Sequence, residues 1–154
     1  MSADLIHLDL PLETDTAALA GRIAPILRPG DVILLEGPIG AGKSAFCRAL
    51  IRARLGRMED VPSPTFTLVQ TYEDEGGDIW HCDLYRLTHP DEVFELGLED
   101  AFANAICLIE WPDRLGADAP ADALRMRFAA LDDGHDVTID APAAWRTRLG
   151  DLHG

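Results

Sequence analysis

The stretch that decides the fold is Val32-Ile-Leu-Leu-Glu-Gly-Pro-Ile-Gly-Ala-Gly-Lys-Ser44, an apolar run that leads into a glycine-rich segment. The run Val32–Leu35 is continuously apolar, which predicts a strand buried on both faces, as in a parallel sheet between helices. The segment Gly37–Ser44 matches the phosphate-binding loop pattern, with glycines, lysine and hydroxyl at the required spacing. Apolar residues have helical spacing over Lys43–Leu55. The sequence therefore predicts a strand, a phosphate-binding loop and a helix in direct succession.

Each fixed position of the glycine-rich segment has a chemical reason. Glycines let the backbone curl so that successive amides point at phosphate oxygens, and the following helix adds its positive N-terminal end. Lys43 supplies a mobile charge for the β- and γ-phosphates, and the Ser44 hydroxyl can bind Mg²⁺. A chance glycine turn is the alternative, but the strand before it and the helix after it are the context that the pattern requires. We therefore expect a nucleotide site.

The rest of the hydrophobic pattern predicts a single small α/β domain over residues 1–154, with a mixed β-sheet flanked by helices. We expect a helix before the decisive strand, capped by an oxygen within Thr14–Thr16 and stopped at Pro29-Gly30. The other predicted strands are Leu5–Leu10, Phe66–Tyr72, Ile79–Asp83, Ile106–Ile109, Leu124–Leu131 and Val137–Ile139, with turns at Glu75–Gly77 and Asp132–Gly134. The helix before the decisive strand is Ala17–Leu27, and the other predicted helices are one from His89, Leu98–Phe102 and Pro142–Leu149.

Composition narrows the function further. The chain of 154 residues has a formal net charge of −14, and 19 of its 27 acidic residues follow residue 60. This argues against a general nucleic-acid clamp, which depends on clustered cations. No apolar stretch approaches the roughly 20 residues of a membrane-spanning helix, and the N-terminal residues lack the basic segment of a signal peptide. The three cysteines are odd in number and without metal spacing, which predicts buried free thiols and a cytoplasmic protein.

A phosphate-binding loop needs a second metal anchor, normally an acidic residue at the end of a neighbouring strand. Glu110 follows the better buried strand, Ile106–Ile109, whereas Asp83 has the more usual identity. We prefer Glu110 as the metal ligand and Asp83 as the residue that orients the attacking water near the γ-phosphate. A solvated strand end, or an ion pair of Asp83 with Arg86, is the alternative for these carboxylates.

The segment Ser63-Pro-Thr-Phe-Thr67 lies where nucleotide switches place a hydroxyl that senses the γ-phosphate, so Thr65 is a candidate sensor. A proline-stiffened connection is the alternative. His81 is expected to be a packed or surface histidine rather than a base. An outward basic edge is either a solvated helix face or a docking patch for RNA or an acidic partner, and it comprises Arg48, Arg52, Arg54 and Arg57.

Four motifs together resemble the TsaE family, the bacterial ATPases of tRNA threonylcarbamoyladenosine biosynthesis. They are Gly37-Pro-Ile-Gly-Ala-Gly-Lys-Ser44, Ser63-Pro-Thr-Phe-Thr-Leu-Val69, His81-Cys-Asp-Leu-Tyr-Arg86 and Ile109-Glu-Trp-Pro112. The resemblance runs from about Pro11 to Pro120. It implies a P-loop ATPase that uses ATP and Mg²⁺, hydrolyses slowly, and resets a complex with two partners of sugar-kinase-like fold, TsaB and TsaD. It implies contact with tRNA only through that complex.

The resemblance also implies roles for individual residues. Asp83 and Thr65 match positions tied to hydrolysis and switching, and Ser44 and Glu110 match the Mg²⁺ ligands, with Trp111 beside Glu110. Ser44 stands where threonine is commoner, but it keeps the hydroxyl. The implied ATP-binding residues are Gly37, Gly40, Ala41, Gly42, Lys43, Ser44 and Ala45.

Two alternatives belong to other functional classes. The first is a small-molecule kinase, which usually has an arginine-rich lid. Between Glu110 and Ala130 the arginines are only Arg114, Arg125 and Arg127. The second is a nucleotide-controlled interaction module whose hydrolysis is incidental. The nearest candidates for an arginine finger are Arg86 and Arg114, and neither is convincing, so we expect partners to supply or order the missing groups.

Overall fold

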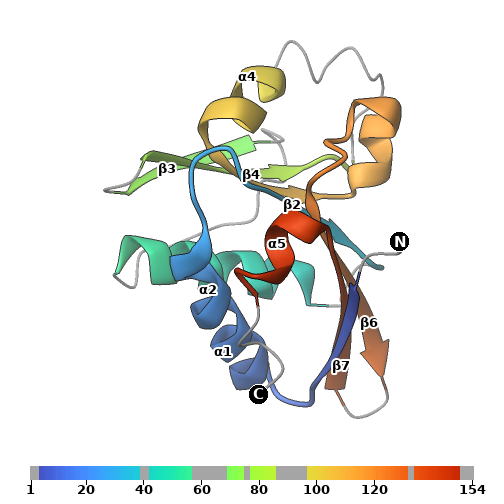
Figure 1. Cartoon of the computed structure of the whole chain (residues 1–154). Helices are drawn as coiled ribbons and strands as arrows, with labels where there is room; N and C mark the ends of the chain where they lie inside the picture. Colours follow the sequence, from blue (N-terminus) through green and yellow to red (C-terminus); the bar gives the residue numbers. More distant parts are fainter. Residues whose placement is uncertain are drawn as a thin grey trace.

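The decisive strand lies in the middle of a seven-stranded mixed sheet (Figure 1). The computed structural model describes residues 4–38, 42–56, 69–74, 77–85, 97–131 and 134–149. The strands are β1 (Asp4–Leu10), β2 (Val32–Glu36), β3 (Val69–Asp74), β4 (Gly77–Asp83), β5 (Ile106–Glu110), β6 (Leu124–Leu131) and β7 (Gly134–Ala141). Their order across the sheet is β1-β7-β6-β2-β5-β4-β3.

Helices cover both faces of this sheet. They are α1 (Glu13–Ile23), α2 (Lys43–Leu55), α4 (Leu98–Asn104) and α5 (Ala143–Arg146), with 3₁₀ helices η1 (Ala24–Ile26) and η2 (Pro112–Asp118). Helices α1 and α2 lie on one side of the sheet and α4 lies on the other (Figure 1). Within the described residues, no helix combines the length and apolar character needed to cross a membrane.

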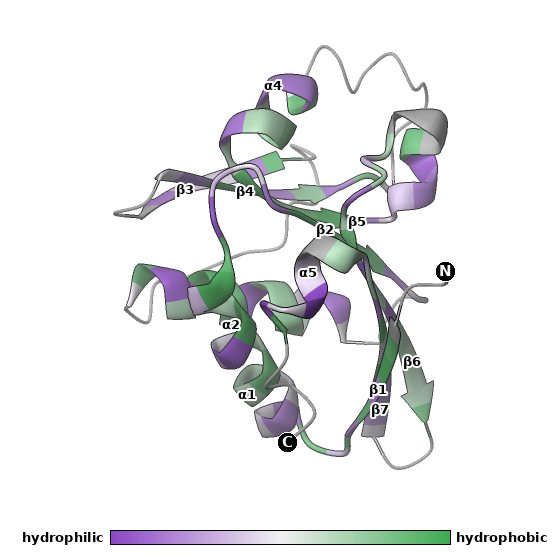
Figure 2. Ribbon diagram, in the orientation of Figure 1, coloured by the Kyte–Doolittle hydropathy of each residue, from purple (hydrophilic) through white to green (hydrophobic). Residues whose placement is uncertain are grey.

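Strand β2 supplies a core residue to each face in turn, because successive side chains of a strand point to opposite faces. Ile33 and Leu35 join the core formed with α1 and α2. Val32 and Leu34 join the core formed with α4 and η2. The strand is therefore apolar along its whole buried length, as its green colour shows (Figure 2).

The directions of the central strands position the functional residues. β2 pairs in parallel with β5, and β5 pairs in parallel with β4. Parallel neighbours end at the same edge of a sheet, so the last residues of β2, β5 and β4 are neighbours there. In the register, Glu110 lies beside both Leu35 and Asp83. This is the edge from which the glycine-rich segment leaves β2.

The predicted α/β class with a mixed, helix-flanked sheet is confirmed. Helix α2 has the predicted bounds, and the predicted hairpins β3–β4 and β6–β7 are both antiparallel pairs. Residue Gly77 was predicted as part of a turn but begins β4. The predicted strand start at Phe66, the helix from His89, and residues 75–76 and 132–133 of the two predicted turns lie outside the described residues.

The first helix differs from the prediction at both ends. It begins at Glu13, and its cap is the Asp15 carboxylate, which accepts a hydrogen bond from the Leu12 backbone N–H at 2.9 Å. The residues Thr14–Thr16 lie inside the first turn instead of before it. The helix ends at Ile23 and continues only as η1, because Pro25 has no N–H with which to extend the α-helical hydrogen bonds.

Two glycine-to-alanine substitutions are expected to change the free energy of unfolding in opposite directions. Gly37 has φ 136°, and a Cβ added there would lie 2.4 Å from the Phe128 carbonyl oxygen. We expect Gly37→Ala to lower the free energy of unfolding by at least about 2 kcal/mol in urea denaturation. Gly21 lies within α1, and a Cβ there meets no described atom within 4 Å. Gly21→Ala should raise stability by about 0.5–1 kcal/mol. Equal stability of the Gly37→Ala protein and the parent would contradict the assigned conformation.

Candidate functional site

Two glycines with positive φ lie at the start of the glycine-rich segment and at the start of the helix within it. Gly37 follows β2 with φ 136°, and Gly42 caps α2 with φ 106°. Both conformations are rare for residues with a side chain, so the glycines are required by the backbone. Ala45 lies in the first turn of α2, after Lys43 and Ser44. The first turn of this helix therefore carries free amides and two functional side chains toward the sheet edge.

Ser44 faces the carboxylate at the end of β5. Its Oγ donates a hydrogen bond to Glu110 Oε1 at 3.2 Å, and Glu110 is only 2% exposed. A hydroxyl and a carboxylate are the oxygen ligands that Mg²⁺ prefers. The two side chains come from α2 and β5, so the pair fits a magnesium ion at the point where the loop helix meets the sheet.

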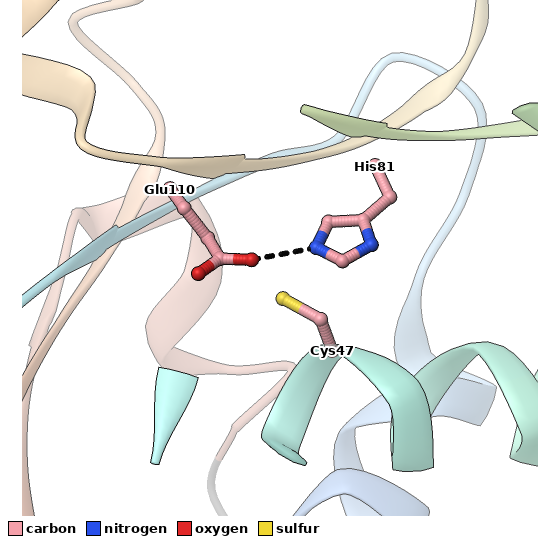
Figure 3. A group of neighbouring side chains, drawn as sticks. All are labelled: Cys47, His81 and Glu110. Carbon is pink, nitrogen blue, oxygen red and sulfur yellow. Dashed lines mark hydrogen bonds and ion pairs between the residues drawn. The ribbon is translucent and has the colours of Figure 1, made fainter. Parts of the chain in front are cut away.

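Glu110 has a second partner on the neighbouring strand. His81 is fully buried, and its Nε2 lies 2.7 Å from Glu110 Oε2 (Figure 3). Cys47 reaches toward this pair from α2, and one possible ligand atom from each of the three residues lies within 4.8 Å of the others. Burial raises the pKa of the Cys47 thiol well above its usual value, and the nearby Glu110 carboxylate raises it further. The thiol is therefore neutral and acts as a small buried group.

Lys43 is buried although it is a lysine. Its side chain is 4% exposed, and its Nζ lies 3.6 Å from the centroid of the Trp111 ring. Burial lowers the pKa of Lys43, while the carboxylates of Glu110 and Asp83 act in the opposite direction. Nζ has no hydrogen-bond partner among the described residues. A buried ammonium without a partner is costly, and a phosphate group is an anion that would satisfy it.

Trp111 holds an unusual backbone conformation at this place. Its φ is 60°, which makes it the one non-glycine residue with positive φ among those described. Its backbone N–H donates to the Leu35 carbonyl at 3.3 Å, and its ring packs on Tyr85 with centroids 4.9 Å apart. Such strain persists where surrounding contacts fix it, often at functional sites. The turn after β5 thereby places the indole ring against Lys43.

Asp83 lies at the end of β4, next to Glu110 in the strand register. Burial raises the pKa of Asp83, while the Tyr85 backbone N–H, which donates to its Oδ1 at 3.0 Å, lowers it. The Glu110 carboxylate raises it further. A half-buried carboxylate with a raised pKa is a stronger hydrogen-bond acceptor for water than an ordinary surface aspartate.

The structure brings four of the predicted site residues to one edge of the sheet, namely Lys43, Ser44, Asp83 and Glu110. Arg114, a candidate arginine finger, is exposed on η2. Outside the described residues lie Gly40, Ala41, Arg57, Thr65 and Arg86.

Two predictions about other side chains can be compared with the structure. The prediction of an outward, solvated or docking role is wrong for Arg54, whose guanidinium donates to the carbonyls of Ala24 and Leu27 at 3.0 and 3.2 Å. These hydrogen bonds tie α2 to η1 and the residue that follows it. The prediction of buried free thiols is confirmed for Cys47, Cys82 and Cys107.

The contacts that surround Glu110 and Lys43 were not predicted from the sequence. His81 was expected to be packed or on the surface, and it is packed, but its bond to Glu110 was not foreseen. His81 and Asp83 are two residues apart on one strand and therefore share a face. This spacing could have placed His81 on the same face as the predicted site. Cys47 lies four residues after Lys43, and the helical repeat places residues at this spacing on the same side of the helix.

The fold and site together define a small α/β protein with a P-loop type of strand–loop–helix unit, whose loop helix faces a carboxylate on the adjacent strand. A family model described as "Threonylcarbamoyl adenosine biosynthesis protein TsaE" matches residues 10–137. The chain belongs to the TsaE family. The match extends beyond Pro120, where the motif resemblance ended.

Individual relatives agree with this assignment. The tRNA threonylcarbamoyladenosine biosynthesis protein TsaE of Rickettsia bellii (strain RML369-C) is 40% identical over 121 residues, covering 79% of this chain and 84% of that protein. The protein of the same name from Bacillus subtilis (strain 168) is 36% identical over 129 residues, covering 82% and 80%. A crystal structure of Bacillus subtilis YdiB superposes with a TM-score of 0.82 at 27% identity, covering 99% of this chain and 97% of that one.

The buried ammonium can be tested directly because Lys43 is the only lysine in the chain. A sample labelled with ¹³C-lysine gives one side-chain signal, and its pH titration by NMR reports this pKa alone. We expect a midpoint below the ordinary value of 10.5, because burial disfavours the charged form. Glu110→Gln should lower the midpoint further, since it removes a charge that favours the ammonium. A midpoint at or above 10.5 in the parent protein would contradict the buried position.

Proposed function

We propose that this protein is a Mg²⁺-dependent ATPase that acts in the biosynthesis of threonylcarbamoyladenosine in tRNA. The observation that carries the proposal is the meeting of Lys43, Ser44, Glu110 and Asp83 at one sheet edge, beside a phosphate-loop sequence. Family membership and the names of the relatives support the pathway. The chemistry of each side chain then supports a role in binding or hydrolysing ATP.

The loop and the first turn of α2 would bind the phosphates. Lys43 lacks a hydrogen-bond partner among the described residues and would donate to phosphate oxygens. Backbone amides would add further donors from Gly37 and from Gly40 to Ala45, and the helix N-terminus would favour the negative charge. A compact ammonium suits this place because it can approach two phosphate groups, whereas a planar guanidinium fits poorly between them.

Ser44 and Glu110 would hold the Mg²⁺ ion. Their oxygens already lie 3.2 Å apart, one from the loop helix and one from the adjacent strand. When bound, the ion neutralises negative charge on the β- and γ-phosphates. The protein's part is to keep one hydroxyl and one carboxylate aimed at the same point, with Glu110 almost wholly removed from bulk water.

Asp83 would accept a hydrogen bond from the attacking water and orient it toward the γ-phosphate. Its position next to Glu110 places it beside the metal site, and its raised pKa makes it a stronger proton acceptor than an ordinary aspartate. Thr65 would sense the γ-phosphate, as its motif position implies. These two residues would link hydrolysis to the state of the segment after α2.

Partner proteins would complete the catalytic site. Arg114 is exposed on η2, so an arginine supplied or ordered in trans would account for slow hydrolysis by the isolated chain. We propose the threonylcarbamoyl-transfer proteins TsaB and TsaD as these partners, in the cytoplasm. The net charge of −14 is unfavourable for a direct grip on tRNA, so the partners would provide most of that contact.

The test is ATP turnover by the purified chain, with and without the two partner proteins. We expect slow turnover alone and a clear increase on adding the partners. Asp83→Asn should lower turnover by at least about 100-fold in both conditions while leaving ATP affinity nearly unchanged, since it removes the water-orienting group and not a phosphate contact.

Asp78→Asn is the matched control, because Asp78 is an exposed aspartate at the other end of the same strand. Its turnover should equal that of the parent. Brisk turnover by the isolated chain, unchanged by partners, would contradict the proposal that partner proteins complete the catalytic site. Full turnover by Asp83→Asn would remove Asp83 from the hydrolytic step.

A further inference from the structure

The buried bond between His81 and Glu110 is a feature that the proposed hydrolysis does not itself use. The two residues lie on adjacent parallel strands, His81 on β4 and Glu110 at the end of β5. His81 is fully buried and Glu110 is 2% exposed, so neither side chain has ready access to bulk water. Their close approach of 2.7 Å is therefore a contact inside the protein core, directly behind the site edge.

The chemistry of the two groups fixes the direction of this hydrogen bond. A carboxylate that binds a cation is ionised and can only accept, so in that role of Glu110 the imidazole Nε2 carries the hydrogen and donates it to Oε2. The other ring nitrogen, Nδ1, is buried without a hydrogen-bond partner among the described residues. Among the described residues, the Glu110 carboxylate is therefore the one hydrogen-bond partner of the His81 ring.

The two oxygens of Glu110 have different nearest partners. Oε2 lies 2.7 Å from His81 Nε2, and Oε1 lies 3.2 Å from Ser44 Oγ. Cys47 packs against the same pair from α2 (Figure 3). A carboxylate held through one oxygen from behind cannot rotate freely about its last bond, so its other oxygen stays directed at Ser44.

We propose that His81 is a positioning residue for the metal site, which holds Glu110 so that one oxygen is presented together with Ser44 Oγ to a divalent cation. This inference rests on the proposed function, because it assumes that Glu110 is a metal ligand. Groups behind metal ligands orient them, and their loss typically weakens metal binding by about 10–100-fold. His81 would therefore set metal affinity without touching the metal or the nucleotide.

The test separates the hydrogen bond from mere filling of the core by using two amide side chains. In His81→Gln the amide nitrogen is as many bonds from Cβ as Nε2 is, so it can donate to Glu110. In His81→Asn the amide nitrogen corresponds to Nδ1, which has no partner among the residues described. His81→Leu fills the space with no donor.

The readout is binding of Mn²⁺, used in place of Mg²⁺ and measured by electron paramagnetic resonance with saturating non-hydrolysable ATP analogue. We expect His81→Asn and His81→Leu to weaken Mn²⁺ binding by about tenfold or more, and His81→Gln to stay within about threefold of the parent. Nucleotide affinity without metal should be the same in all of them. Thermal unfolding of each variant is measured in parallel.

Cys82→Ala is the control for loss of stability, because Cys82 is buried on the same strand but belongs to the core on the opposite face. It should lower the melting temperature and leave Mn²⁺ binding unchanged. Parent-like Mn²⁺ binding in His81→Leu would overturn the inference, as would equal losses in His81→Gln and His81→Asn. If His81→Leu does not fold, the difference in Mn²⁺ binding between His81→Gln and His81→Asn tests the positioning role.

Glu110→Gln distinguishes failure of the inference from failure of the proposed function. If the parent binds Mn²⁺ with nucleotide and Glu110→Gln does not, the metal site stands and the His81 variants test the positioning role alone. If Glu110→Gln binds Mn²⁺ as the parent does, Glu110 is not the ligand. The assigned metal site and the role of His81 then both fail.

Discussion

The buried carboxylate of Glu110 connects the candidate site to the sheet, because it contacts side chains from both α2 and β4. An ionised group at 2% exposure is strongly unfavourable unless it is hydrogen-bonded, and here a serine from α2 and a histidine from β4 meet that need. The histidine contact requires β4 and β5 to pair in parallel with Asp83 beside Glu110. The topology of the sheet and the chemistry of the site therefore impose the same register.

A second constraint comes from the loop. Gly37 can occupy its place only because it has no Cβ, and Gly42 allows the chain to enter α2 with positive φ. These glycines bring Lys43 to the sheet edge, where the strained turn at Trp111 places an aromatic ring against it. In a chain whose other permanent cations are arginines, the single lysine occupies this buried position, where the proposed function needs a compact charge.

Local patterns predicted much of this structure. The apolar run at Val32 and the glycine spacing gave β2 and the bounds of α2, and the position of Glu110 after a buried run placed it at the sheet edge. The bond of His81 to Glu110 depends on the register of strands that are distant in sequence, which periodicity does not specify. The capping oxygen of α1 comes from Asp15, within the predicted segment, but Asp15 is the third helical residue, so the helix begins earlier than expected.

The proposed function depends above all on nucleotide binding by Lys43 and the sheet edge beside it. Calorimetric titration of a non-hydrolysable ATP analogue with Mg²⁺ into the parent, Lys43→Ala and Lys43→Arg proteins tests it most directly. We expect one binding site in the parent and a loss of affinity of at least about tenfold in Lys43→Ala, the size expected for a charge-assisted hydrogen bond. Lys43→Arg should also bind more weakly, because the guanidinium keeps the charge and changes its shape. Unchanged affinity in Lys43→Ala would show that Lys43 does not bind the nucleotide.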